Sequence, residues 1–475
     1  MNNETVKKPT LVYSLFILAM VVVIIATGML VFGASIQIMM FITLITLIPF
    51  VSRLGHSYQS VEKSIFQSML QALQPSMILL AVGVLIGSWM ASGTVPALLY
   101  YGIQAISPQF FLVTTLLFCS IVSLATGSSW ATLGTAGIAM MGVGQSLGIP
   151  VGMTAGAIIS GAYFGDKLSP LSDSTNLSAT VVGSDLMVHI KHMLWTTVPA
   201  YVLTAIIFTF MGLRYGKGSV NSVDVETLTT YLAEHFNLGV VPFIPVVILF
   251  VLLITKRPAI TSIFIGALAG AVVAILYQST TLSHILQVFY DGYYVESGID
   301  IIDTLLQRGG LTSMLPLVAL FLFALGIGGL LQKAGVLETI VVSITSRVKS
   351  RGMLVFVSIL TAYFTLGMGG SFSFSAVMTG TLLKPIYERF NLRPENLSRI
   401  IEDCATQSCA LPPWTASGIF TAAALGVSPL VYIPFCFLAM ITPLFTLIYG
   451  ITGFTFTEKE KKSVVKRYKE EAVEA

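Results

Sequence analysis

Two carboxylates and a group of hydroxyls interrupt an apolar stretch of the chain at residues 165–176. Asp166 and Asp173 flank a break that contains Pro170. The other oxygen-bearing residues of this cluster are Ser169, Ser172, Ser174, Thr175 and Asn176. Proline ends a helix and frees backbone carbonyls, which join carboxylates and hydroxyls as ligands for a hard cation. The cluster therefore predicts a cation-binding site.

The rest of the sequence indicates that this cluster lies within a membrane. The chain has 475 residues, of which 55% are hydrophobic and 10% charged, whereas roughly a quarter are charged in soluble domains. Apolar runs recur from end to end, each near the ~20 residues needed to cross the hydrocarbon core, and about a dozen crossings are expected. Charged groups at that depth face a protein interior or an aqueous cavity, usually to move ions or protons. The net charge of +3 gives no indication of a nucleic-acid partner.

We expect the chain to fall into five parts. They are N-terminal spans with an interfacial segment (1–74), a first transport repeat (75–213), an outer loop with connecting spans and a second interfacial segment (214–310), a second transport repeat (311–452) and a charged tail (453–475). The basic residues of the tail favour a cytoplasmic C-terminus, because lysine and arginine are retained on that side. The four cysteines lie in apolar runs without metal-ligand spacing, so they are expected to pack as small hydrophobic side chains, and no cofactor is expected.

A pattern of glycines and prolines occurs twice, and three of its matched pairs are offset by 241 to 243 residues. The matched positions are Gly87 with Gly328, Gly127 with Gly370, and Pro170 with Pro412. Secondary transporters are often built from two repeats whose interrupted helices meet at the substrate site. The alternative is that glycine and proline are simply common in membrane helices. Four matches in order along the chain, with the Gly148-Ile149-Pro150 turn and its counterpart at 392–394 included, favour two repeats.

Three further broken segments contain candidate ligands. They are Ser128 and Ser129 in 126–130, Ser371 and Ser373 in 369–375, and Asp403, Trp414 and Thr415 in 402–415. The first segment could also be a packing patch of small residues. Arg399 precedes Glu402 and Asp403 by three and four residues, so helix-surface ion pairs are an alternative there. Lys167 is expected either to neutralise Asp166 in part or to extend to the membrane interface.

These motifs resemble those of the NhaC family of sodium/proton antiporters, which includes sodium-coupled malate/lactate antiporters. The resemblance rests on Gly-Asp-x-x-Ser-Pro-x-Ser-Asp-Ser-Thr at 165–175 and on Pro-Trp-x-x-x-Gly at 413–418, and it extends over most of the chain. It implies an all-α polytopic protein of the bacterial inner membrane, with about 10–13 membrane segments in two inverted repeats that carry interrupted helices and re-entrant hairpins. It also implies that Asp166 and Asp173 carry sodium and the proton.

By the same resemblance, Ser128, Ser371 and Trp414 flank the site. Relatives often have asparagine after the Pro-Trp pair, where this chain has Thr415. Thr415 lacks an amide oxygen, so a contribution of the second half to ion binding does not follow from the resemblance.

We therefore expect a secondary active transporter that exchanges sodium for protons through a shared carboxylate site, in the lipid bilayer, as a monomer or a homodimer. Removal from water disfavours the charged form of a carboxylate, and sodium restores the lost stabilisation while displacing the proton. An enzyme is not expected. Intramembrane aspartyl proteases pair a Tyr-Asp motif with a Gly-x-Gly-Asp motif. This chain has Tyr290-Asp291 and Gly165-Asp166, but their order is reversed and Tyr163 occupies the position of the first glycine.

The alternative function is sodium- or proton-coupled antiport of a small organic acid such as malate or lactate, or of an amino acid. A carboxylate substrate would favour a basic partner in the core. Lys167, Lys333 and Lys384 are the only core-adjacent cations expected, none clearly internal, and no arginine is expected at the broken segments. That pattern favours simple cation exchange, although serines and backbone N–H groups can also hold a carboxylate.

Overall fold

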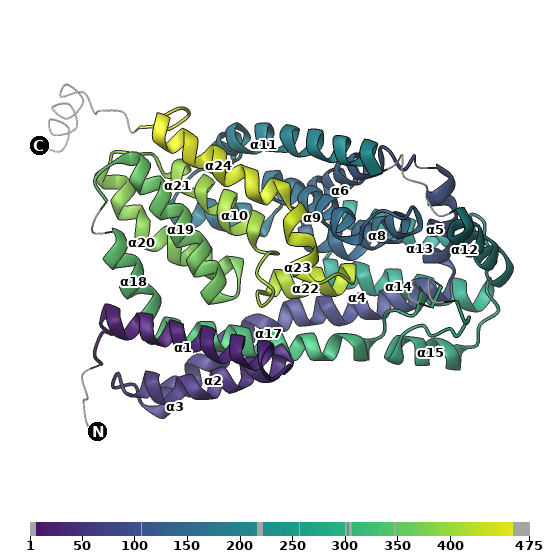
Figure 1. Cartoon of the computed structure of the whole chain (residues 1–475), viewed down its shortest axis with the longest axis horizontal. Coiled ribbons are helices and arrows are strands. Elements are labelled where there is room, and N and C mark those ends of the chain that lie inside the picture. Colours follow the sequence, from purple (N-terminus) through teal and green to yellow (C-terminus); the bar gives the residue numbers. More distant parts are fainter. Residues whose placement is uncertain are drawn as a thin grey trace, which may run out of the picture.

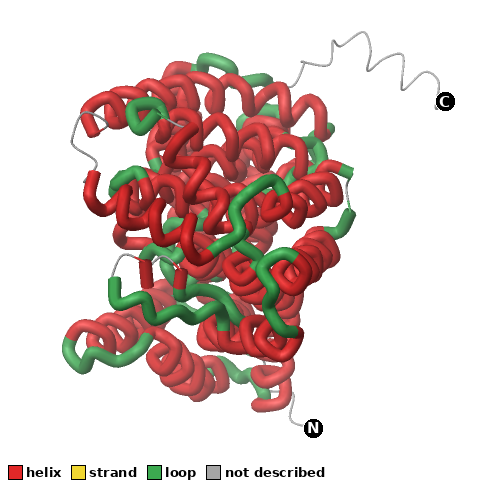
Figure 2. Tube along the Cα trace, turned by 90° about the vertical axis from the view of Figure 1, so that its right-hand side faces the viewer, coloured by secondary structure: helices red, strands yellow, loops and turns green. Residues whose placement is uncertain are grey.

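The computed structural model describes residues 6–105, 107–215, 222–255, 257–299, 302–303, 306–345 and 348–458. Within these residues the chain is helical, and the extended backbone is limited to two isolated bridges, Tyr293 with Arg308 and Leu392 with Glu458. Viewed end on, the trace consists of closely packed helices joined by short loops (Figure 2). The tail that we predicted to be cytoplasmic lies outside the described residues from 459 onward.

The N-terminal part and the first repeat contain eleven described α-helices. They are α1 (Leu11–Leu30), α2 (Ile36–Ser52), α3 (Tyr58–Met69), α4 (Leu73–Ala91), α5 (Thr94–Ala105), α6 (Phe111–Thr126), α7 (Ser129–Thr132), α8 (Ile138–Ser146), α9 (Val151–Leu168), α10 (Asp173–Val182) and α11 (Leu186–Tyr215). A π-helical segment, Leu133–Gly137, connects α7 to α8. The 3-10 turn Leu70–Ala72 connects α3 to α4.

The described helices of the second part follow after residue 221. They are α12 (Ser222–His235), α13 (Ile244–Ile254), α14 (Ala259–Leu276), α15 (Leu282–Asp291), α17 (Leu311–Lys333), α18 (Val336–Thr345), α19 (Arg351–Gly369), α20 (Phe372–Arg389), α21 (Pro394–Ile401), α22 (Ala416–Leu425), α23 (Pro429–Tyr432) and α24 (Phe437–Thr452). A second π-helical segment, Glu402–Thr406, extends α21.

Three helices precede a glycine break in each half, α4, α5 and α6 in the first and α17, α18 and α19 in the second. The break after α6 and the break after α19 have the same local form. Gly127 (φ 68°) and Gly370 (φ 70°) end the two helices in the left-handed conformation. Ser128 and Ser371 then cap the next helix and accept hydrogen bonds from Ala131 N (3.2 Å) and Phe374 N (3.3 Å). The inverted orientation of the two halves stays a prediction.

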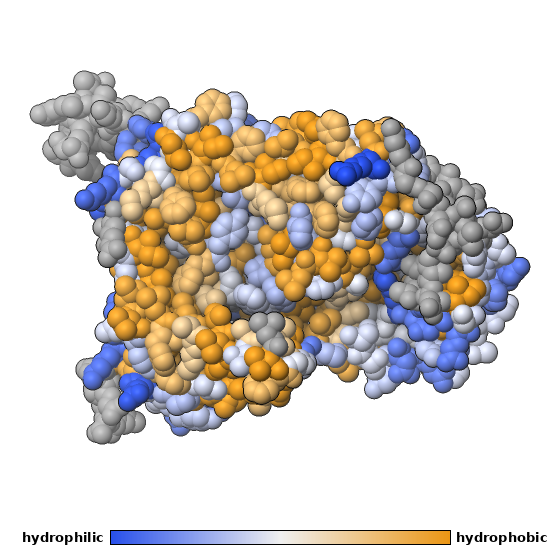
Figure 3. Space-filling view, in the orientation of Figure 1, coloured by the Kyte–Doolittle hydropathy of each residue, from blue (hydrophilic) through white to orange (hydrophobic). Residues whose placement is uncertain are grey.

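Apolar helices of spanning length are frequent in the described residues. Five are long and apolar enough to cross a membrane, or six if the pair α22 and α23, bent by 84°, forms one broken span. The five are Leu11–Met29, Tyr58–Ala91, Leu186–Tyr215, Leu311–Lys333 and Arg351–Gly369, and six shorter apolar helices accompany them. The start of α1 and the end of α24 lie at one end of the long axis, and α12 and α15 at the other (Figure 1). Apolar side chains cover most of the visible surface between these ends (Figure 3).

The site-bearing helix α9 packs closely along α6. Added Cβ atoms at Gly161 and Gly165 would overlap atoms of α6, and at Gly165 the nearest are Leu124 N and Ser123 Cβ, both at 2.5 Å. Small residues allow such backbone contact, which is the usual way for membrane helices to associate. The end of α9, where the candidate site begins, is therefore held at a fixed distance from α6.

Candidate functional site

Asp166 lies in the last turn of α9 and is buried, with 8% of its surface exposed. Its carboxylate accepts hydrogen bonds from Ser129 Oγ (2.6 Å) at the start of α7 and from Ser172 Oγ (2.5 Å) at the cap of α10. Thr175 Oγ1 donates to the backbone oxygen of Lys167 (2.9 Å). Two breaks in the helical structure, before α7 and before α10, therefore bring hydroxyls to one buried carboxylate.

Lys167 follows Asp166 directly but has a different partner. Its side chain is completely buried and forms an ion pair with Asp403, in the π-helical segment of the second half. Asp403 also accepts hydrogen bonds from Thr196 Oγ1 (3.1 Å) on α11 and Thr446 Oγ1 (2.5 Å) on α24. Both expectations for Lys167 were wrong, because adjacent helical residues point about 100° apart and Lys167 faces the second half.

The expected surface ion pairs of Arg399 were also wrong. Arg399 is completely buried, and its Nη1 donates to Thr455 Oγ1 (2.8 Å) while its guanidinium lies over the Phe456 ring at 5.0 Å from the centroid. Glu402 is completely buried as well, and its Oε1 accepts a hydrogen bond from Ser178 Oγ (2.8 Å). The expectation of no internal basic side chain was wrong for Lys167 and Arg399, because tertiary packing, which the sequence does not display, encloses them.

Carboxyl residues outnumber lysine and arginine in the buried part of the described structure, which also contains His189 and His192. The buried carboxyl residues are Asp166, Glu395, Glu402 and Asp403, and the buried lysine and arginine are Lys167 and Arg399. An isolated charge in a low-dielectric interior is unstable unless it is paired, so an unpaired carboxylate takes up a proton or binds a cation. Among the described residues Asp166 forms no ion pair, because Lys167 pairs with Asp403 and the side chains that donate to Asp166 are the hydroxyls of Ser129 and Ser172. This arrangement is suited to exchange of a hard cation and a proton.

The other residues of the 165–176 cluster divide between packing and solvent. Asp173 is exposed at the first turn of α10, and Ser174 lies beside Ser172 with 3.0 Å between their hydroxyl oxygens. Ser169 donates to Leu124 O (3.1 Å). Asn176 donates to Ser172 O at 2.8 Å. The structure thus places Asp166 and Asp173 in different environments, one enclosed and one at the surface.

The residues of the second half collect around the Gly367–Gly370 turn. Trp414 Nε1 donates to Gly367 O (2.6 Å), and Thr415 caps α22 by accepting from Gly418 N (3.1 Å). Ser371 is half-buried in its capping position, and Ser373 is exposed. These residues stabilise the breaks between α19 and α20 and before α22, and none of their described hydrogen bonds reaches Asp166.

Sequence reasoning did not single out Thr196, Thr446 or Ser178, and it ranked Glu402 below Asp403. All four belong to the buried polar network. Threonine and serine are common on membrane helices, so their types gave no signal. Glu402 could have been singled out because it stands next to Asp403 in a chain that has few acidic residues.

The apolar helices and the enclosed polar site define a multi-pass membrane transporter. Residues 161–454 match the model of the Na⁺/H⁺ antiporter family. The chain is 38% identical over 466 residues to the malate-2H⁺/Na⁺-lactate antiporter of Bacillus subtilis (strain 168), covering 98% of this chain and 99% of that protein. It is 37% identical to the Na⁺/H⁺ antiporter NhaC of Alkalihalophilus pseudofirmus (strain OF4), covering 94% and 96%. The chain therefore belongs to the NhaC family of Na⁺/H⁺ antiporters.

One further relative and one solved structure are also similar to this chain. The arginine/ornithine antiporter ArcD of Halobacterium salinarum is 33% identical over 458 residues, with 96% of this chain and 94% of that protein covered. A solved structure, the YdaH transporter of Alcanivorax borkumensis, aligns with a TM-score of 0.37 at 15% identity and covers 88% of this chain and 99% of that one. The named relatives are transporters rather than enzymes.

Proposed function

We propose that this protein exchanges sodium for protons across the bacterial inner membrane and that Asp166 is the carboxylate that the two ions share. The observation that carries the proposal is the enclosure of Asp166 between two hydroxyl donors, while the neighbouring Lys167 pairs with Asp403. A buried carboxylate without a basic partner has to be neutralised, and a proton or a sodium ion can do this.

The local oxygens favour sodium as the competing ion. Ser129 and Ser172 present hydroxyl oxygens, which can turn from donating a hydrogen bond to accepting a cation because the hydroxyl hydrogen rotates freely. When the proton leaves Asp166, the same oxygens surround an anion and can coordinate a hard cation. Exchange is then coupled without covalent chemistry, because one site holds one ion at a time and the site changes sides only when an ion is bound.

The proposal includes the orientation of the chain. The basic residues of the tail favour the cytoplasm for the end of the molecule where α1 begins and α24 ends (Figure 1). The opposite end, with α12 and α15, then faces outward. Asp173, exposed next to the Ser172 cap, is in a position to attract cations toward the site, and we assign it this accessory role.

Proteoliposomes that contain a pH-sensitive dye test the assignment. Sodium addition in buffer without metabolites should drive proton flux, and Asp166→Asn should abolish it while the protein remains folded and inserted. Asp185→Asn is the matched control, because Asp185 is an exposed carboxylate at the start of α11. Asp173→Asn should weaken the apparent sodium affinity and leave the maximal rate. Near-normal flux in Asp166→Asn would refute the assignment.

A second candidate function is coupled antiport of an organic acid or an amino acid. Two relatives support it, the one named for malate and lactate and the one named for arginine and ornithine. Proton flux that requires an added organic acid or amino acid would favour this function. Proton flux in their absence, unchanged when they are added, would exclude it.

A further inference from the structure

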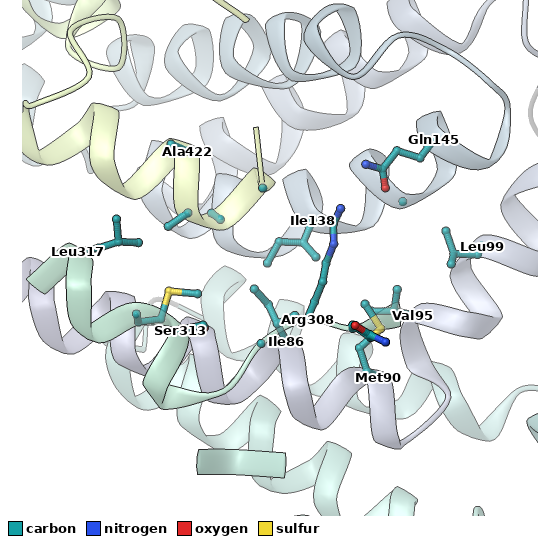
Figure 4. Close-up of a pocket in the computed structure, with 17 residues that line it drawn as sticks. Ile86, Met90, Val95, Leu99, Ile138, Gln145, Arg308, Ser313, Leu317 and Ala422 are labelled. Atoms are coloured by element: carbon teal, nitrogen blue, oxygen red, sulfur yellow. The ribbon is translucent and has the colours of Figure 1, made fainter. Parts of the chain in front are cut away.

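A cavity of about 350 Å³ lies away from Asp166, between α4, α5, α8, α17 and α22 (Figure 4). Most of its wall is apolar, with Met90, Leu99, Ile138, Met314 and Leu317 among the contributing side chains. A volume of this size is at the lower end of the range for small-molecule sites in proteins, which are typically apolar with a few placed polar groups.

One charged side chain, Arg308, lines the cavity and extends between Ile86 and Ile138 (Figure 4). No aspartate or glutamate is among the lining residues, and neither of the two ion pairs in the described part of the chain involves Arg308. Within those residues its guanidinium makes no hydrogen bond, although a Cβ added to Gly426 would lie 3.1 Å from Nη1. The guanidinium therefore lies by the C-terminal end of α22, where a positive charge is favoured, and its five donors remain available to a ligand.

The backbone around Arg308 is fixed by main-chain contacts. Tyr293 N donates to Arg308 O (3.0 Å), and Gly310 N donates to Gly83 O (2.8 Å) on α4. Gly309 (φ 89°) and Gly310 (φ 83°) adopt conformations that disfavour other residues and let this segment contact α4 directly. A binding group on a rigidly held backbone loses little freedom when its ligand arrives.

We propose that this cavity binds a small monocarboxylate with an apolar carbon chain, with Arg308 holding the carboxylate. Arginine pairs with a carboxylate through two parallel hydrogen bonds, and one guanidinium suits one such group. Gln145 and Gln307 also line the cavity, and their amide groups offer neutral N–H donors. A second carboxylate or an ammonium group would face apolar walls or neutral amides, and burying it unpaired is unfavourable. Monocarboxylates are therefore preferred over dicarboxylates, amines and amino acids.

This carboxylate site is separate from the cation site but shares one broken helix with it. Ser129, which contacts Asp166, begins the broken helix whose later residues Ile138, Gly142 and Gln145 line the cavity. At 1.5 Å rise per residue, the spacing between Ser129 and Gly142 is roughly 20 Å. The proposal does not depend on sodium/proton exchange, because a ligand can bind here whatever ion Asp166 holds.

Equilibrium binding to the purified protein in lipid nanodiscs tests the proposal, with butyrate, succinate, butylamine and 2-aminobutyrate as a matched series. Butyrate should bind, and the other three at least tenfold more weakly. Arg308→Gln should weaken butyrate binding at least tenfold, and Arg308→Lys should retain part of it. The control Arg214→Gln, an exposed arginine at the end of α11, should bind as the unaltered protein does.

Two further variants keep the test decisive. Ala422→Phe fills the cavity without changing charge and should abolish butyrate binding even if Arg308→Gln does not fold. Asp166→Asn should bind butyrate normally, so failure of the proposed exchange function and failure of this site are distinguishable. The proposal is overturned if butyrate does not bind, if butylamine binds equally well, or if butyrate binding persists in a folded Arg308→Gln or Ala422→Phe protein.

Discussion

Removal of either partner of the Lys167–Asp403 ion pair should strongly destabilise the fold, and by unequal amounts. Breaking a buried ion pair costs about 3–5 kcal/mol because it leaves one charge buried alone. Lys167→Met leaves Asp403 with the hydroxyl donors of Thr196 and Thr446, so a cost near the lower value, about 3 kcal/mol, is expected. Asp403→Asn leaves the ammonium of Lys167 without its described partner, so about 5 kcal/mol is expected.

The double variant distinguishes this explanation from a simple packing effect. Lys167→Met with Asp403→Asn removes both charges, and its cost should be smaller than the sum of the two single costs by at least about 2 kcal/mol. Equilibrium unfolding in mixed detergent micelles measures all three. Lys191→Met, an exposed lysine on α11, is the control and should change stability by less than about 0.5 kcal/mol. Additive single costs would refute the inference that the two residues form one buried pair.

Three other outcomes are expected. The sodium concentration for half-maximal exchange should rise about tenfold for each unit by which the pH falls below the pKa of the site, because protons and sodium compete for one carboxylate. A half-maximal concentration independent of pH would indicate separate paths for the two ions. Gly165→Ala should lower the stability of the fold by about 1–3 kcal/mol, because the added Cβ overlaps α6, and it should impair exchange. Gly367→Ala is the control, because its added Cβ meets nothing within 4 Å, and it should leave the thermal unfolding of the protein unchanged. Thr415→Ala should cost about 1 kcal/mol through loss of the α22 cap, whereas Thr415→Ser should retain most of that stability in the same assay.

The parts of the site that the sequence predicted are those formed by neighbouring residues. Ser172 and Asp166 lie six residues apart across a proline, so the break and its oxygens were visible in the motif itself. Ser129 was identified through its glycine turn. The Lys167–Asp403 pair joins residues 236 positions apart, and no local pattern specifies it. The helical fold was predictable for a related reason, since the length of each apolar segment and the glycines and prolines that interrupt it can be read from neighbouring residues.

The cavity around Arg308 could not have been found in this way. The sequence suggested a second interfacial segment within residues 214–310, and a positive charge at the membrane interface is unremarkable. Only the close approach of Gly309 and Gly310 to α4 places Arg308 against apolar walls from five separate helices. Cavities are formed by the packing of distant segments, whereas sequence motifs report on near neighbours.

The ion pair between the two halves also restricts which parts can slide during a transport cycle. Separating α9 from the π-helical segment would expose two unpaired charges at a cost of about 3–5 kcal/mol, which slows such a step by roughly 10² to 10⁴ if the cost falls on the barrier. The tight glycine contact of α9 with α6 adds a third element to the same unit. These elements are therefore expected to travel as one block, and access to Asp166 should switch by sliding at the borders of that block rather than by opening through its centre.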